Sequence, residues 1–208
     1  MTVRIPSAPS DVSRVRQILT QQVSSLIHTR SGPTGQVPSG PVRIRVPLPE
    51  VPLLSWLHAQ PTERKVYWAG REDAWRVAGI GTADILEGSG ENPYRTVVRT
   101  LQRRLDQADP ALRYFGGFRF RPRTPRSSRW RRFGTYRFLL PRFELRREDG
   151  ATVLLMNLLP EETGGSAGPL LEEIDRLRFR ATESSPSVPE ARALDHRPDR
   201  TDGAEGVK

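Results

Sequence analysis

The chain has 208 residues, 36% of them hydrophobic, and a formal net charge of +9. This length suits one domain with a buried core and is short for two. The chain contains no cysteine, which excludes disulfides and thiolate metal sites. It also shows no apolar run of the kind that forms a signal sequence or a membrane span, so we expect a cytoplasmic protein without membrane contacts.

The first part of the chain predicts a helix, a loop and a strand. Ser10 is a suitable N-cap for a helix whose apolar residues recur at three-to-four spacing as far as Ile27. A loop rich in Gly and Pro begins at Ser31-Gly32-Pro33. Residues 42–46 then alternate apolar and charged side chains, which predicts a strand that Pro47 closes.

Two antiparallel strands follow, predicted over residues 65–69 and 75–86. Gly79-Ile80-Gly81 lies inside the second of them. It does not fit a dinucleotide-binding fingerprint, because Asp84 stands where the third glycine is needed and no helix follows. We interpret these glycines as positions where another backbone or side chain comes close to the strand.

Two more helices and a polar tail complete the predicted elements. Asn92-Pro93 is a strong helix start, and Asp109-Pro110 ends that helix. Pro169 opens a third helix, whose early acids and late arginines suit the helix dipole. From residue 183 the chain has hardly any aliphatic residues, so we predict one domain over 1–182 and a disordered tail or truncated interdomain linker over 183–208.

The middle of the chain carries nearly all of the excess charge. Between Arg113 and Arg147 there are 12 arginines and one acid, a net charge of +11, so the rest of the chain carries −2. Period-two alternation over 118–121 and 143–146 predicts strands with aromatic residues on a buried face and arginines in water. Asp149-Gly150 predicts a hairpin turn, and Pro141 predicts an edge strand or a bulge.

The same arginines allow a second interpretation, an RNA-binding module. Arginines interleaved with aromatics are typical of such surfaces, and binding would then depend on salt and on Arg129, Arg131 and Arg132. However, residues 113–120 depart from the glycine and aromatic order of an RNA-recognition strand, and aromatics in a core cannot stack on bases. We therefore favour the solvated sheet face and do not expect nucleic acid as a partner.

Two ordered blocks resemble the N-terminal region of isochorismate synthases, which belong to the chorismate-utilising enzyme family. The first block is Val66-Tyr67-Trp68 leading to Ala78-Gly79-Ile80-Gly81. The second runs from Phe115-Gly116-Gly117-Phe118-Arg119-Phe120 through Trp130, Phe133 and Phe138 to Leu140-Pro141-Arg142-Phe143-Glu144. The resemblance implies part of a two-lobed α/β sandwich, so the predicted fold class is α+β, a mostly antiparallel sheet with helices packed on one face.

The resemblance also implies a reaction, the isomerisation of chorismate to isochorismate in a menaquinone or siderophore pathway. That reaction needs a base, an acid and, in this family, Mg²⁺. In the family the lysine base, the glutamate acid and the glutamate metal ligands belong to a C-terminal lobe whose positions this chain lacks. We therefore expect a non-catalytic portion, truncated, frameshifted or split before the active site, with no cofactor of its own and with a separately encoded catalytic lobe as partner. A third interpretation is a stand-alone interaction domain that self-associates through an uncovered apolar surface.

No catalytic, cofactor-binding or metal-binding residue is predicted in this chain. The residues considered are isolated or have an electrostatic explanation. The two acid pairs are predicted to be solvated or to complement a helix dipole. The candidates are His28, His58, His196, Lys65, Glu161-Glu162 and Glu172-Glu173.

Overall fold

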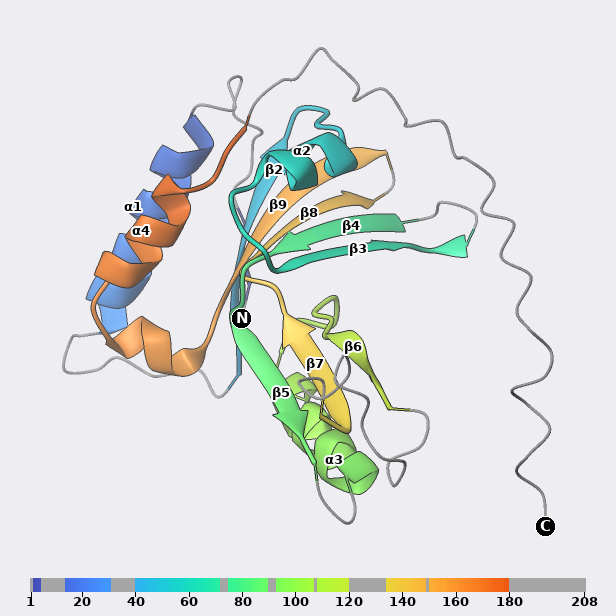
Figure 1. The fold of residues 1–208 in the computed structure, drawn as a ribbon. Coiled ribbons are helices and arrows are strands. Elements are labelled where there is room, and N and C mark those ends of the chain that lie inside the picture. The colour runs from blue at the N-terminus through green and yellow to red at the C-terminus, as the bar shows by residue number, and fades with distance from the viewer. Residues whose placement is uncertain are drawn as a thin grey trace, which may run out of the picture.

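The computed structural model describes residues 2–4, 14–30, 40–71, 75–89, 93–106, 108–119, 134–148 and 150–179. These residues form two sheets and their covering helices (Figure 1). The strands are β1 (Thr2–Arg4), β2 (Val42–Leu48), β3 (Lys65–Ala69), β4 (Trp75–Ile80), β5 (Asp84–Gly88), β6 (Phe115–Phe118), β7 (Tyr136–Leu140), β8 (Phe143–Glu148) and β9 (Ala151–Leu158). The helices are α1 (Arg14–Arg30), α2 (Leu53–Ala59), α3 (Pro93–Leu105) and α4 (Gly168–Asp175), with a 3₁₀ helix, η3 (Pro160–Gly164), before α4.

The larger sheet has the strand order β1-β2-β9-β8-β4-β3 and is antiparallel except for the short β1–β2 pair. One face of this sheet carries α1, α2 and α4 (Figure 1). The register places Ile44 opposite Met156 and Leu145 opposite Leu154, so alternate residues of the strands face these helices. All four of these side chains are buried in one core with the apolar residues of the three helices. The predicted α+β class, with helices on one face of a mostly antiparallel sheet, is confirmed.

The smaller sheet, with the order β5-β7-β6, packs against α3 below the larger one (Figure 1). The chain passes between the sheets at two points. After β4, Gly81 has a φ of 68°, in the left-handed region that favours glycine, and the chain turns into β5. The prediction of one strand over 75–86 is therefore wrong. Pro141 lies at the second passage, between β7 and β8, rather than at an edge or a bulge within one strand.

Two turn predictions have clear outcomes. The hairpin at Asp149-Gly150 is confirmed by the pairing of Glu148 with Ala151 and by a φ of 78° at Gly150. The strand predicted to end at Pro47 continues to Leu48. Pro47 lies opposite Val153 of β9, and β1 pairs only with residues 43–45 of β2, so β1 does not reach Pro47 on the other side of the strand.

Several predictions concern residues outside the described ranges. These are the N-cap at Ser10, the aromatics Phe120, Trp130 and Phe133, the arginines at 129, 131 and 132, and the tail from residue 183. Among the helices that the structure does describe, none has the length and apolar character needed to cross a membrane.

Candidate functional site

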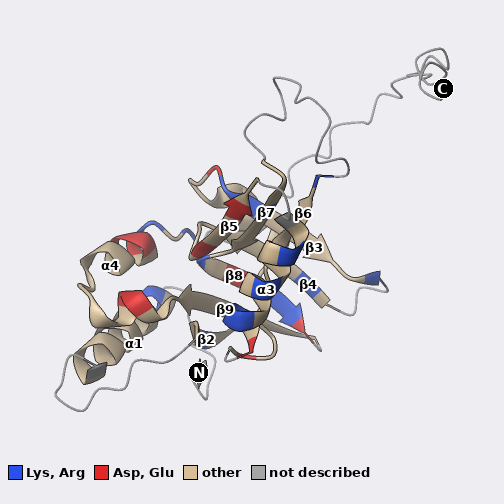
Figure 2. Ribbon diagram, turned by 90° about the horizontal axis from the view of Figure 1, so that it is seen from below, with Lys and Arg blue, Asp and Glu red and all other residues tan. Residues whose placement is uncertain are grey.

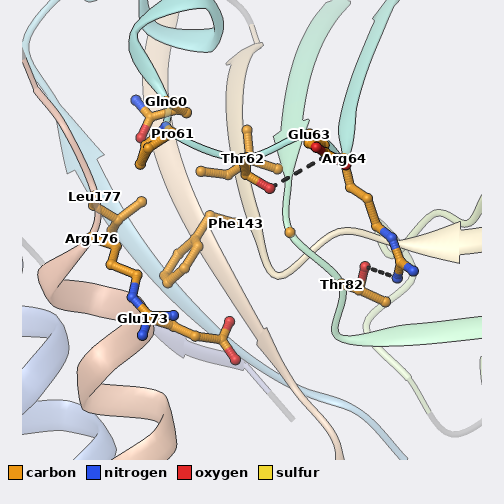
Figure 3. A pocket seen from close by; sticks show the side chains of 12 residues that line it. Gln60, Pro61, Thr62, Glu63, Arg64, Thr82, Phe143, Glu173, Arg176 and Leu177 are labelled. Atoms are coloured by element: carbon orange, nitrogen blue, oxygen red, sulfur yellow. Dashed lines mark hydrogen bonds between the residues drawn. The ribbon is translucent and has the colours of Figure 1, made fainter.

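A cleft of about 540 Å³ lies between α4, the loop from α2 to β3, and the end of β4 (Figure 3). Its floor is apolar and consists of Ile80, Phe143 and Leu177, each at most 5% exposed. A volume of this size accommodates a small organic molecule. The walls and rim are formed by Gln60, Pro61, Thr62, Glu63, Arg64, Gly81, Thr82, Glu173 and Arg176.

Gln60 holds two walls of the cleft together. Its side-chain amide donates to the carbonyl of Trp56 at 2.9 Å and to that of Arg178 at 2.7 Å, and its oxygen accepts from the backbone N–H of Arg178 at 3.1 Å. These bonds join the end of α2 to the segment after α4, 118 residues further along the chain. Because Gln60 is buried and fully bonded, it positions the walls and is not free to bind a ligand.

Arg64 crosses the opposite rim (Figure 3). Its Nη1 donates to the hydroxyl of Thr82 at 3.0 Å, and its carbonyl accepts from Gly81 N–H at 3.2 Å. The left-handed turn at Gly81 brings Thr82 back toward β3 and makes both bonds geometrically possible. The guanidinium is exposed to solvent and is the positive group of this rim.

Arg142 is buried behind the cleft and binds Glu173, the carboxylate in its wall. Its Nε donates to Glu173 at 2.9 Å, and its Nη1 donates to Glu162 at 2.9 Å and to the carbonyl of Asn157 at 2.6 Å. Burial by itself would lower the pKa of Arg142, but the hydrogen bond with Glu162 and the charges of Glu173 and Glu162 raise it above the ordinary value. One guanidinium thus ties the start of β8 to η3 and α4.

These contacts limit the chemistry available in the cleft. Of its two carboxylates, Glu173 is paired with Arg142, and Glu63 lies exposed at the rim. Neither lysine nor histidine is among the residues that line it. Across the described ranges, no group of three or more His, Cys, Asp or Glu side chains is placed to hold a metal ion.

The opposite face of the larger sheet carries a buried cluster of charged and amide side chains. The register places Arg43 of β2 opposite Asn157 of β9, and the Arg43 Nε donates to the Asn157 amide oxygen at 2.9 Å. Glu144 of β8 accepts from Asn157 at 2.6 Å, from Arg146 Nε at 2.8 Å and from Arg43 Nη2 at 3.4 Å. All four side chains are at most 3% exposed. Each buried charge thus has opposite charge and hydrogen bonds beside it, which offsets its desolvation.

The segment after α3 covers this cluster. Arg146 Nη1 donates to the carbonyl of Ala111 at 2.8 Å, and the carboxylate of Asp109 lies 3.8 Å from Arg43. Burial lowers the pKa of Arg43 to about 10, although the charge of Glu144 opposes that shift. Burial alone would raise the pKa of Asp109, but hydrogen bonds from Thr2 and from the N–H of Ala111 lower it. The cluster fastens the chain after α3 to the larger sheet.

The prediction that arginines of the middle segment lie in water is therefore wrong for Arg142 and Arg146, which are buried. Arg146 is buried because the chain after α3 covers its face of β8, whereas Arg142, just before β8, is buried by its pairing with Glu162 of η3 and Glu173 of α4. The prediction that the aromatics are buried is correct for Phe143, whereas Phe118 is 42% exposed.

The candidate residues considered from the sequence are scattered. His28 and His58 are exposed on α1 and α2, and His196 lies outside the described ranges. Lys65 Nζ donates to the backbone carbonyl of His58 at 3.4 Å, and both residues are exposed. The glycine interpretation is supported at Gly79, where an added Cβ would lie 2.7 Å from the Cγ of Pro141.

The acid pairs divide between surface and interior partners. Glu161 and Glu172 are exposed and pair with Arg104 and Arg176, in agreement with a solvated position. Their neighbours Glu162 and Glu173 instead bind the buried Arg142. The sequence patterns did not predict this pairing. One signal for the interior cluster was present, since Glu144 is the single acid among 12 arginines.

Comparison with known proteins establishes the family of this protein. A family model described as chorismate binding enzyme matches residues 34–202, most of the chain. The protein therefore belongs to the chorismate-binding enzyme family.

Two relatives make the comparison more specific. Chloroplastic isochorismate synthase 2 of Arabidopsis thaliana is 27% identical over 176 residues, which is 74% of this chain and 30% of the plant protein. The structure of MenF, the menaquinone-specific isochorismate synthase from Escherichia coli, matches with a TM-score of 0.50 and 23% identity over 77% of this chain and 34% of MenF. This structural match shows a shared fold, and the resemblance inferred from the two sequence blocks is confirmed. The chain spans about a third of the length of both relatives.

Proposed function

We propose that this chain is the N-terminal, non-catalytic portion of an isochorismate synthase of the menaquinone type. The observation that carries the proposal is the coverage: 74% of the chain aligns with the plant isochorismate synthase, but with only 30% of that enzyme. In the family the groups that perform the isomerisation are in a C-terminal lobe. The role of this portion is then to support that lobe.

The geometry of the described residues agrees with a supporting role. Of the carboxylates at or near the cleft, Glu173 and Glu162 are held by Arg142, and Glu63 lies exposed at the rim. Glu144 is fully buried between Arg43 and Arg146. Carboxylates held in this way stabilise the packing of strands and helices, whereas a general acid or base must reach the substrate.

The first test uses the purified chain with chorismate and Mg²⁺, followed by chromatographic detection of isochorismate. We expect no isochorismate above the uncatalysed background. Turnover by the chain alone, abolished by the change of a residue within it, would overturn the non-catalytic assignment.

The second test asks whether this portion supports an isochorismate synthase. The segment of E. coli MenF that aligns with this chain is replaced by residues 2–179, which include β1 and α1, and the chimaera is assayed for isochorismate. We expect turnover, because the matching fold should place the MenF lobe correctly. The matched control is the same chimaera with Arg142→Met, which loses the ion pairs of Arg142 with Glu162 of η3 and Glu173 of α4. A folded but inactive chimaera would count against the proposed role.

A further inference from the structure

The cleft beside α4 has two ends of opposite charge and an apolar floor. Figure 3 shows Arg64 and Glu173 on opposite sides of the cleft. Its floor consists of Ile80, Phe143 and Leu177. A small molecule that fills the cleft therefore meets a cation at one end, a carboxylate at the other and apolar carbon beneath it.

Arg64 is a positioned cation without an acidic partner. Its Nη1 donates to the hydroxyl of Thr82 at 3.0 Å, and its backbone N–H donates to the hydroxyl of Thr62 at 3.4 Å. Among the described residues, no carboxylate, that of Glu63 included, lies within ion-pair distance of its guanidinium. Each of the two hydroxyls accepts from Arg64, so its own proton can be donated to a ligand oxygen. This end of the cleft fits a carboxylate.

Glu173 offers an acceptor at the other end. Its Oε2 accepts from Arg142 at 2.9 Å, whereas its Oε1 has no partner among the described residues, and its side chain is 35% exposed. Arg142 also pairs with Glu162, so one guanidinium serves two carboxylates and leaves one negative charge uncompensated by it. This end fits a hydroxyl donor and repels a second carboxylate.

We propose that the cleft binds a small hydroxylated ring carboxylate, with its carboxylate at Arg64 and the hydroxyl on the opposite end of the ring at Glu173. The ring covers the apolar floor, and the volume of about 540 Å³ suits a ligand of this size. A free amino acid fits less well, because its ammonium would lie next to its carboxylate and therefore beside Arg64. Binding in this cleft requires no turnover, so it is independent of the proposed function.

The test measures binding of para-hydroxybenzoate and its longer homologue para-hydroxyphenylpropionate to the purified chain by isothermal titration calorimetry. We expect saturable binding of at least one of them with a Kd below about 1 mM. The methyl ester of that ligand lacks the negative charge, and a second analogue lacks the hydroxyl. Each should bind about tenfold more weakly than the hydroxylated acid.

Protein variants show whether Arg64 and Thr82 hold the carboxylate. Arg64→Gln should weaken binding of the acid about tenfold and leave that of the ester unchanged. Thr82→Val keeps the shape of the side chain without its hydroxyl and should weaken binding of the acid about threefold or more.

The matched control is Arg99→Gln, which removes an exposed arginine of α3, a helix that Figure 2 shows apart from α4. It should change the Kd by less than about twofold. Thermal unfolding of each variant shows whether it is folded. No saturable binding of either acid below about 10 mM, equal affinity for the acid and its ester, or an equal loss with Arg99→Gln would each overturn the proposal.

Discussion

The buried charge cluster gives the sharpest test of how this fold is stabilised. Glu144 has no exposed surface and accepts hydrogen bonds from Arg43, Arg146 and Asn157. Glu144→Gln keeps nearly the same volume but removes the negative charge between two buried guanidiniums. Loss of one partner from a buried ion pair costs about 3–5 kcal/mol, because the remaining charge stays desolvated.

That loss is large relative to the total stability of a domain, about 5–15 kcal/mol. For a chain of this size it corresponds to a fall in Tm of about 6–20 °C. We expect urea unfolding, followed by far-UV circular dichroism, to show a lower midpoint with an unchanged slope. The four tryptophans provide an independent fluorescence signal for the same transition.

Two controls decide whether charge is the cause. Glu172→Gln removes an exposed carboxylate that pairs with Arg176, and its expected cost is at most about 1 kcal/mol. R43M/E144L/R146M replaces the charges together with apolar side chains and should recover most of the loss. If Glu144→Gln costs no more than Glu172→Gln, buried charge pairing does not hold this face of the sheet together.

Three further changes probe packing and pH dependence. Gly79→Ala should lower the free energy of unfolding by about 1–3 kcal/mol, because the new Cβ would lie 2.7 Å from the ring of Pro141. Gly117→Ala is the control, since nothing lies within 4 Å of its new Cβ, and it should cost less than about 1 kcal/mol. Thermal unfolding measures both changes. The pKa of Asp109 is lowered in the folded protein, so Asp109 contributes folding stability above its unfolded pKa of about 4. This contribution is lost as the pH falls through the folded pKa. Asp109→Asn should therefore make the free energy of unfolding fall less steeply with decreasing pH on the acid side. A parallel slope for the two proteins would contradict this. Burial and a hydrogen bond to Asp84 raise the pKa of Tyr114. The contribution of Tyr114 to folding stability is therefore present below its unfolded pKa of about 10 and is lost as the pH rises above that value. Between about pH 9 and pH 11, urea unfolding should show a smaller loss of stability for Tyr114→Phe than for the unchanged protein.

Much of the fold could be read from short-range patterns. Asp149-Gly150 determined a hairpin because few residues other than glycine tolerate a positive φ in a tight turn. Alternation over residues 143–146 determined a strand, and Pro93 determined where a helix begins. The ordered blocks between residues 66 and 144 determined the family, which the match over residues 34–202 confirms.

Other features depended on which segments meet in space. The alternation of β8 shows that its two faces differ, but it does not show what covers the face of Glu144 and Arg146. That face is buried because the chain after α3 folds over it, and Asn157 reaches Glu144 only through the β8–β9 register. Similarly, Glu173 meets Arg142 through the packing of α4 beside β8.

The sequence by itself determined the local conformations and the family, because these depend on neighbours along the chain. The tertiary structure decided which arginines lie in water and which are buried in ion pairs, since the desolvation of a charge depends on every segment that packs around it.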